Sequence, residues 1–249
     1  MRRQSFAVEL PGLVHNPWSP RVPVGAGVSL LSRLRGGWGA DPLWGVVYDF
    51  LVEHPVVGRP VWFAGTHSDL RRLHATADEV GRLPDGSRVL DVPCGGGVAL
   101  RGLRPSQRIE YVAADLAPEM LERTRQAALR RGVMHLVTTR QADVGALPFE
   151  DDSFDLVLSL TGLHCFPDPR RAVEEMARVL RPGGRLVGSA LLNDTGLAFE
   201  PLRRGGRLGG LIGPCCTSTE LASWSAAAGV PLDVELAGAF GYFAGVKAG

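Results

Sequence analysis

The middle of the chain alternates between short apolar runs and longer segments whose apolar residues recur every three or four positions. A short apolar run bounded by turn residues is typical of a buried strand, and the longer period is typical of a helix packed on one side. These patterns predict a doubly wound, Rossmann-like α/β fold, a mostly parallel sheet with helices on both faces. The predicted strands are 89–91, 109–114, 135–139, 154–160 and 185–192, and the helices between them are 118–131 and 169–180.

Two helices are predicted ahead of the first strand. Asp41 is a suitable N-cap and Pro42 a suitable first residue for a helix that Pro55 stops. Ser68 is a suitable N-cap for the second helix. We expect helices at 42–54 and 69–83, and an arm or lid at 1–40, where Pro, Gly and Arg are frequent. The chain would then consist of an N-terminal part, 1–83, that covers the site, and a core formed by 84–249.

The last part of the chain departs from the alternation. Residues 193–219 form a long, Gly-rich connection, and a long loop of this kind is often functional, so we expect a substrate lid at 193–218. Thr217 and Glu220 have the spacing of a capping box for a helix that runs to Ala228. Two strands follow, 232–236 and 240–246, and predict an antiparallel hairpin at one edge of the sheet.

Composition excludes several classes of protein. The 249 residues are 45% hydrophobic and carry a formal charge of +1, so no basic excess indicates nucleic acid or an anionic membrane as a partner. The four cysteines form no CxxC pair and have no histidine at zinc spacing, so we expect a reduced, cytoplasmic protein. Asn193-Asp194 has no second carboxylate pair to help it bind a metal ion, so we expect no metal. No apolar run approaches the roughly 18 residues that a membrane-spanning helix needs. The oligomeric state cannot be predicted from these features.

A glycine-rich turn follows the first strand of the core. Asp91 closes the strand, and Gly95, Gly96 and Gly97 allow backbone to approach a ligand without a Cβ in the way. A dinucleotide turn needs a third glycine three residues later, which is absent here, so NAD and FAD are disfavoured. Asp115, 18 positions past Gly97, suits a carboxylate that accepts hydrogen bonds from ribose hydroxyls. The predicted ligand is a nucleoside with a tail smaller than pyrophosphate.

Five ordered blocks resemble the class I S-adenosylmethionine-dependent methyltransferases, in particular the small-molecule subgroup that includes the ubiquinone and menaquinone C-methyltransferases. The resemblance covers residues 85–192, and the order and spacing of the blocks make it specific. The blocks are Val89-Leu-Asp-Val-Pro-Cys-Gly-Gly-Gly97, Ala114-Asp-Leu-Ala-Pro-Glu-Met-Leu121, Ala142-Asp-Val-Gly-Ala-Leu-Pro-Phe149, Asp152-Ser-Phe-Asp-Leu-Val157 and Arg178-Val-Leu-Arg-Pro-Gly-Gly-Arg-Leu186.

The resemblance implies a site for S-adenosylmethionine, whose product would be S-adenosylhomocysteine. It implies that Asp115 binds the ribose hydroxyls and that Leu116 packs on the adenine. The family usually has a glycine where this chain has Pro93, a residue that fixes φ near −65° and has no N–H. The resemblance also implies that Asp143 and Val144 meet the adenine edge and that the backbone near Leu160 holds the methionine amine. The methionine part of the cofactor would lie on the turn formed by Asp91, Pro93, Cys94, Gly95 and Gly97.

Methyl transfer depends mainly on alignment and desolvation, and it needs a base only where the acceptor must lose a proton. His164 is the candidate catalytic base, because it lies on the loop after the fourth strand and imidazole titrates near neutral pH. The alternative is a histidine that shapes the pocket or packs the loop. Aromatic and apolar residues outside the resembling region indicate an apolar or aromatic acceptor, although such residues also form cores; they are Trp44, Phe50, Trp62, Phe63 and 208–212.

We therefore expect an enzyme that moves a methyl group from S-adenosylmethionine to an O, N or C atom of a small, partly apolar molecule. Two alternatives stay open. A non-catalytic S-adenosylmethionine-binding or scaffold protein would keep the fold without transfer. A methyltransferase of nucleic acid or protein would need a basic groove or an Asn/Asp-Pro-Pro-aromatic loop after the fourth strand, where this chain has Leu163-His-Cys-Phe-Pro167.

Overall fold

The computed structural model describes residues 42–249, except for the side chains of residues 42–46 and 49. The predicted arm over 1–40 and the predicted cap at Asp41 lie outside the described residues, as does the side chain of Trp44. The helices are α2 (Pro42–Glu53), α3 (Pro55–Thr66), α4 (Leu70–Ala77), α5 (Pro118–Arg130), α6 (Pro169–Val179), α7 (Glu200–Leu208) and α8 (Ser218–Ala227). The strands are β1 (Arg88–Asp91), β2 (Glu110–Asp115), β3 (Val137–Gln141), β4 (Phe154–Leu160), β5 (Leu180–Leu191), β6 (Leu232–Ala237) and β7 (Phe240–Val246).

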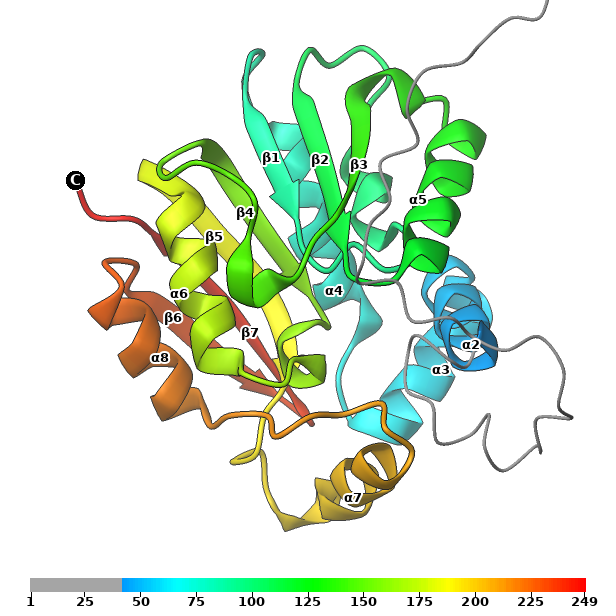
Figure 1. Ribbon diagram of the computed structural model, residues 1–249. Coiled ribbons are helices and arrows are strands. Elements are labelled where there is room, and N and C mark those ends of the chain that lie inside the picture. The colour runs from blue at the N-terminus through cyan, green and yellow to red at the C-terminus, as the bar shows by residue number, and fades with distance from the viewer. Residues whose placement is uncertain (1–41) are drawn as a thin grey trace, which may run out of the picture.

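The strands form one sheet in the order β3-β2-β1-β4-β5-β7-β6 (Figure 1). The first five are parallel, and β7 pairs antiparallel with both β5 and β6. Strand order reverses between β1 and β4, so their carboxyl ends flank the switch point where ligands bind in such sheets. The predicted fold and the edge hairpin are confirmed.

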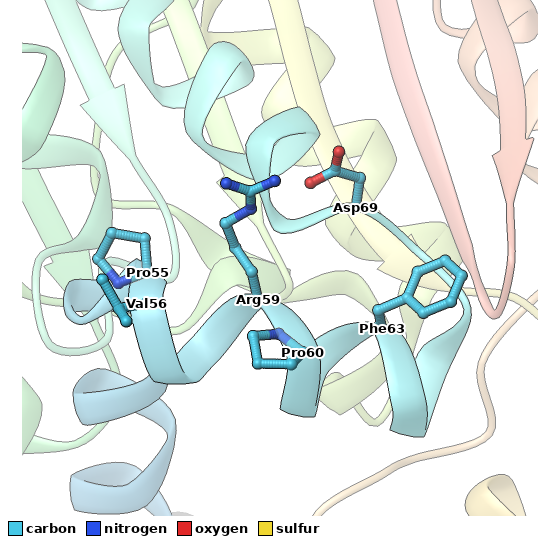
Figure 2. A pocket seen from close by; sticks show the side chains of 6 residues that line it. All are labelled: Pro55, Val56, Arg59, Pro60, Phe63 and Asp69. Carbon is cyan, nitrogen blue, oxygen red and sulfur yellow. The ribbon is translucent and has the colours of Figure 1, made fainter.

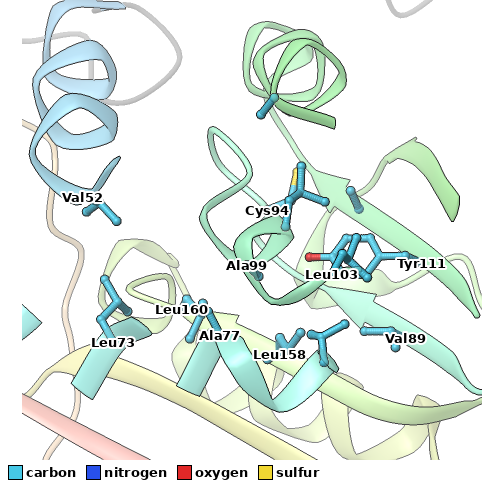
Figure 3. Close-up of a cluster of buried hydrophobic side chains, with 14 of the residues drawn as sticks. Val52, Leu73, Ala77, Val89, Cys94, Ala99, Leu103, Tyr111, Leu158 and Leu160 are labelled. Carbon is cyan, nitrogen blue, oxygen red and sulfur yellow. The ribbon is translucent and has the colours of Figure 1, made fainter. Parts of the chain in front are cut away.

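Helices cover both faces of the sheet because its central strands are apolar on both sides. One core cluster packs α4 and α5 on β1, β2 and β4 and includes Leu73, Tyr111 and Leu158 (Figure 3). The other cluster packs α6 and α8 on the opposite face, where Met176 and Leu221 meet β4 and β5. The two layers hold the carboxyl ends of the strands in fixed positions.

Several predicted boundaries shift by a few residues. The third strand begins at Val137 rather than at residue 135, because Met134–Leu136 form a 3₁₀ turn. The fifth strand begins at Leu180, since Leu180 already pairs with Phe154, and the register then shifts before Leu156. The capping box of Thr217 and Glu220 is present and begins α8.

The region before the core differs most from the prediction. Pro55 does end α2, but it also begins α3, a helix that the sequence did not reveal. The prediction that Ser68 caps the next helix is wrong: Asp69 accepts a hydrogen bond from the Arg71 N–H and is the cap. The Ser68 hydroxyl instead pairs with the Tyr242 hydroxyl at 3.0 Å, which ties the start of α4 to β7.

Residues 193–218, predicted as a lid, contain α7 and a buried arginine. The Arg203 guanidinium donates to the carbonyls of Leu192 and Gly196 and to the hydroxyl of Thr195, and pairs with Glu200. These bonds fold the segment back onto the end of β5. Figure 1 shows α7 near α3 at the edge of the sheet where β4 and β5 finish.

Candidate active site at the carboxyl edge of the sheet

The glycine turn leaves β1 and leads into a 3₁₀ helix, Val98–Gly102. Gly95 and Gly97 have φ values of +50° and +88°, which favour glycine at both positions. No atom lies within 4 Å of where a Cβ on Gly95 would be, so the backbone borders open space there. The turn is fixed from behind, because the Cys94 N–H donates to the Ala114 carbonyl on β2 at 2.8 Å.

Pro93 joins Val92 through a cis peptide bond. Its ring lies directly against Gly162, which follows β4, and a Cβ on Gly162 would overlap the ring. The Ser159 hydroxyl is buried beside Gly162 and has no hydrogen-bond partner among the described residues. Pro93 therefore brings the glycine turn into contact with the loop after β4, and Gly162 is the residue that permits this contact.

Asp115 ends β2 and faces the glycine turn. One carboxylate oxygen accepts the Gly95 N–H and the other accepts the Ala117 N–H, both at 3.0 Å. The side chain is only 8% exposed, and burial raises its pKa against the opposing effect of these backbone donors. Each carboxylate oxygen has two lone pairs, so acceptor capacity is left for a ligand hydroxyl.

Asp91 lies deeper, beneath the turn, and does not reach the surface. It is 1% exposed, and the Tyr111 hydroxyl donates to its Oδ2 at 2.6 Å. Burial raises the Asp91 pKa to about 7, the Tyr111 hydrogen bond opposes this rise, and the charge of Asp115 adds to it. Sequence reasoning missed Tyr111, whose only signal is its place in a buried strand.

The ends of β2 and β3 offer the surfaces expected for a flat base. The Leu116 side chain is 65% exposed directly after Asp115, although leucine is normally buried. Asp143 is exposed, and its Oδ1 accepts the Gly145 N–H at 2.8 Å, while the neighbouring Val144 is buried. The Gln141 amide donates to the Leu116 carbonyl, which links the ends of β3 and β2.

The loop that carries Asp143 is held from α6. Glu175 is buried and accepts the Leu147 N–H at 2.8 Å, and it pairs with Arg178 at 2.8 Å. The Arg178 guanidinium also donates to the carbonyls of Leu147 and Phe149. The hydrogen bond from Arg178 lowers the pKa of Glu175, so the Glu175 carboxylate stays charged at neutral pH. Sequence analysis did not identify this pair as support for the site.

The end of β4 brings Leu160 and Thr161 to the same edge. Thr161 has a φ of +51°, a conformation that a β-branched residue rarely adopts. It is held there by the Ser189 hydroxyl, which accepts its N–H at 3.2 Å, and by a 2.6 Å hydrogen bond between its hydroxyl and that of Tyr48 from α2. Helix α2 is thereby attached to the loop after β4.

His164 follows on that loop and is 5% exposed. Its Nδ1 accepts the Leu191 N–H at 3.2 Å, so the ring proton belongs on Nε2. Burial lowers the His164 pKa to about 4, and the ring is therefore neutral at neutral pH. In this state His164 offers a donor at Nε2, whereas the expected base would need a lone pair there.

The structure thus brings the glycine turn, Asp115, Leu116, Asp143 and Leu160 to one edge of the sheet, with Asp91 and Cys94 buried beneath. The Cys94 thiol accepts a hydrogen bond from the Thr124 hydroxyl at 3.4 Å. Burial raises the pKa of the thiol, so Cys94 is not an activated nucleophile.

Among residues 42–249, no group of three His, Cys, Asp or Glu side chains is placed to hold a metal ion. The same residues contain no helix long and apolar enough to cross a membrane.

A separate hollow lies on the outer side of α3 (Figure 2). Its volume is about 600 Å³, and its walls are mostly apolar with one arginine and one aspartate. None of the residues expected to bind the cofactor lines it. The lining residues are Pro55, Val56, Arg59, Pro60, Phe63 and Asp69.

The part of the chain that builds this edge also matches a known family, described as a methyltransferase domain, over residues 90–188. Residues 90–188 belong to the methyltransferase family. The methyltransferase domain therefore begins in β1, ends in β5, and includes the glycine turn, Asp115, Asp143 and His164.

Curated relatives extend the match. A phthiotriol/phenolphthiotriol dimycocerosates methyltransferase of Mycobacterium ulcerans is 31% identical over 195 residues, which cover 75% of this chain and 66% of that protein. A demethylmenaquinone methyltransferase of Thermus thermophilus is 44% identical over 101 residues, which cover 40% of this chain and 45% of that protein. The chain spans only 36% to 49% of the length of several other curated relatives that it matches.

Solved structures share the fold of the methyltransferase domain. Geranyl diphosphate methyltransferase in complex with S-adenosylmethionine aligns with a TM-score of 0.61 at 15% identity, over 72% of this chain and 85% of that one. At this identity the likeness establishes the fold and leaves the ligand and the acceptor to be argued from the site.

Proposed function

We propose that the protein transfers a methyl group from S-adenosylmethionine to an O, N or C atom of a small, partly apolar molecule. The family of residues 90–188 and the relatives named as methyltransferases of quinone and lipid compounds support this proposal. When bound, S-adenosylmethionine supplies a methyl group on a positively charged sulfur. The protein's own contribution is to bind, orient and desolvate the two reactants.

The residues at the carboxyl edge fit this group. The open space over Gly95 leaves room for a methionine chain along the turn that begins at Pro93. The Asp115 carboxylate has free lone pairs for ribose hydroxyls, and the exposed Leu116 side chain offers an apolar face to adenine. Asp143 and Val144 would border the adenine edge, and the backbone near Leu160 would receive the methionine amine.

One observation carries the proposal: Asp115 joins two strand ends. Its carboxylate binds the turn through Gly95 and its own loop through Ala117, so ribose and methionine subsites are fixed relative to each other before any ligand arrives. This preorganisation reduces the ordering that binding would otherwise require. A dinucleotide tail finds no third glycine in this turn, in agreement with a shorter ligand.

For His164 we propose a positioning role, in which Nδ1 holds the Leu191 N–H and Nε2–H faces the acceptor side. The base role expected from the sequence would need the other tautomer, and that would set two N–H groups against each other. Residues 193–218 are proposed as the lid over the acceptor, since Gly213 donates to the His164 carbonyl at 2.7 Å. A cytoplasmic location and the absence of nucleic-acid, membrane and metal partners stay predictions.

The proposal is tested by incubating the protein with methyl-labelled S-adenosylmethionine and extracts of small molecules, followed by mass spectrometry. The expected result is S-adenosylhomocysteine together with one labelled product. Binding of the cofactor without any turnover across broad panels of acceptors would instead support a non-catalytic protein of the same fold.

A further inference from the structure

Trp62 is the side chain with which α3 enters the core. It is 8% exposed, whereas its neighbours Val61 and Phe63 are 48% and 59% exposed. Gly58, one turn earlier, lets α3 approach the backbone of α2 so closely that a Cβ there would overlap the Leu51 carbonyl. The helix is thus placed so that an indole ring from its inner side is buried.

The indole N–H of Trp62 has no hydrogen-bond partner within the described part of the chain. A buried indole N–H normally finds an acceptor, because leaving it unpaired forfeits the hydrogen bond that water would provide. Most buried polar groups in folded proteins are paired, so each exception needs an explanation. An acceptor supplied by a ligand would explain this one.

The surroundings of Trp62 connect it with the loop after β4. Its ring stacks on Phe240 at a centroid distance of 5.1 Å and an angle of 15°, and it lies 6.1 Å from the ring of Tyr48. Phe240 in turn meets His164 edge to face at 6.2 Å. The Tyr48 hydroxyl reaches Thr161 at the end of β4. The unpaired donor therefore belongs to a group of packed aromatic side chains, Tyr48, Trp62, Phe240 and His164, which we call the aromatic wall and which contacts the loop after β4.

The chemistry of this aromatic wall restricts what it can bind. None of its four described side chains is charged at neutral pH, since the pKa of His164 lies near 4. An anionic acceptor would be desolvated there without a countercharge, which is costly. An uncharged oxygen suits the indole N–H, and an aromatic ring that carries this oxygen suits contact with the aromatic side chains around it.

We propose that the Trp62 indole N–H is a specificity-determining donor that binds an uncharged oxygen on the ring of an aromatic acceptor. This inference rests on the proposed function, because it assigns the acceptor side of the same site. It goes further by naming the residue that distinguishes an oxygenated ring from a plain hydrocarbon.

Two probes of nearly equal shape test it: 2-methoxynaphthalene, which has an ether oxygen, and 2-ethylnaphthalene, which has a methylene in its place. Their affinities are measured by fluorescence for the wild type, for Trp62→Phe and for Trp224→Phe, a matched change on α8. The wild type and Trp224→Phe should bind the ether about five- to tenfold more tightly than the hydrocarbon. Trp62→Phe should bind the two probes equally and keep its affinity for the hydrocarbon.

A second measurement uses the wild type alone and does not depend on the folding of a variant. The indole N–H resonance of Trp62 should move downfield when 2-methoxynaphthalene is added and should not do so with 2-ethylnaphthalene. Equal affinities of the wild type for both probes, a preference that survives in Trp62→Phe, or an unmoved resonance would overturn the inference. The affinity for S-adenosylmethionine is measured on the same samples. If the wild type does not bind S-adenosylmethionine, the proposed function is contradicted, whereas the preference between the two probes reports on Trp62 alone.

Discussion

The Tyr111 hydroxyl donates a 2.6 Å hydrogen bond to Oδ2 of Asp91, and neither side chain is more than 1% exposed. The pair joins β2 to β1 directly beneath the glycine turn. A single donor does not offset the cost of burying a carboxylate, so the pKa of Asp91 rises from 3.8 to about 7. Both the stability of the protein and the charge beneath the cofactor turn therefore depend on pH.

The first prediction concerns this dependence. Between pH 4 and pH 7 the folded protein holds a proton on Asp91 that the unfolded chain has released, so Asp91 lowers the free energy of unfolding as pH rises. The slope from one such group is about 1.4 kcal/mol per pH unit. Asp91→Asn should remove it, so the variant gains stability relative to the wild type from pH 5 to pH 7 in urea unfolding. A constant difference between the two proteins across this range would contradict the raised pKa.

The second prediction has the opposite sign. The folded pKa of His164 is lowered from 6.5 to about 4, so the unfolded chain binds a proton that the folded protein refuses between these values. His164 therefore lowers the free energy of unfolding as pH falls from 6.5 to 4. The pH profile of turnover should show no limb near 6.5 that belongs to this residue. A limb near 6.5 that disappears in His164→Asn would show that the ring titrates during the reaction.

The third prediction separates positioning from base catalysis. Asn places its side-chain oxygen near the position of Nδ1 and can still accept the Leu191 N–H, whereas Leu cannot. His164→Leu should lower the free energy of unfolding by about 1–3 kcal/mol through the unpaired N–H, and His164→Asn by less. Turnover of a labelled acceptor should fall much further in His164→Leu than in His164→Asn. Equal and large losses of kcat in both variants would instead indicate a base.

The fourth prediction concerns the support behind the loop that carries Asp143, the proposed adenine contact. Glu175→Ala leaves the Leu147 N–H and the Arg178 guanidinium without their carboxylate, and should lower the free energy of unfolding by about 3 kcal/mol. It should also weaken S-adenosylmethionine binding, because the loop of Asp143 loses its attachment to α6. The neighbouring Glu174→Ala removes only pairs at the surface and should cost less than about 1 kcal/mol. Similar losses in the two variants would count against the buried role of Glu175.

The sheet could be predicted because its strands are buried on both faces and bounded by turn residues. Phe154–Leu160 is such a run, and its observed bounds are those predicted. Boundaries moved where tertiary pairing decides, as at Leu180, which already pairs with Phe154 before the turn at Pro182. Local sequence does not show which residues an approaching strand will pair.

The region before the core could not be predicted to the same depth. The segment of α3 contains two prolines and two glycines, which argue against a helix, and it is held by Trp62 and the close approach at Gly58. Ser68 and Asp69 are equally good caps in the sequence, and Tyr242, 174 positions away from Ser68, decides between them. The aromatic wall likewise depends on contacts between α2, α3, the loop after β4 and β7, so its partners could not be known from spacing.

The residues proposed to bind the cofactor were easier to place, because they lie at or just past the carboxyl ends of parallel strands. Asp91 and Asp115 end β1 and β2, and Asp143 follows β3, all at the same edge, as their spacing predicted. Their different environments were not visible in the sequence: Asp91 is buried, Asp115 is 8% exposed and Asp143 is exposed. This gradient agrees with the proposed ligand contacts of Asp115 and Asp143, and it leaves Asp91 beneath the turn.

The most direct test of the account is the affinity of S-adenosylmethionine for the wild type, for Asp115→Asn and for Asp233→Asn, an exposed control on β6. Calorimetry should show binding to the wild type and the control, and at least a tenfold weaker binding to Asp115→Asn, since a charge-assisted hydrogen bond contributes about 1.5–3 kcal/mol. Thermal unfolding checks that the variants remain folded. No binding to the wild type, or equal binding to all three folded proteins, would contradict the placement of the cofactor at Asp115.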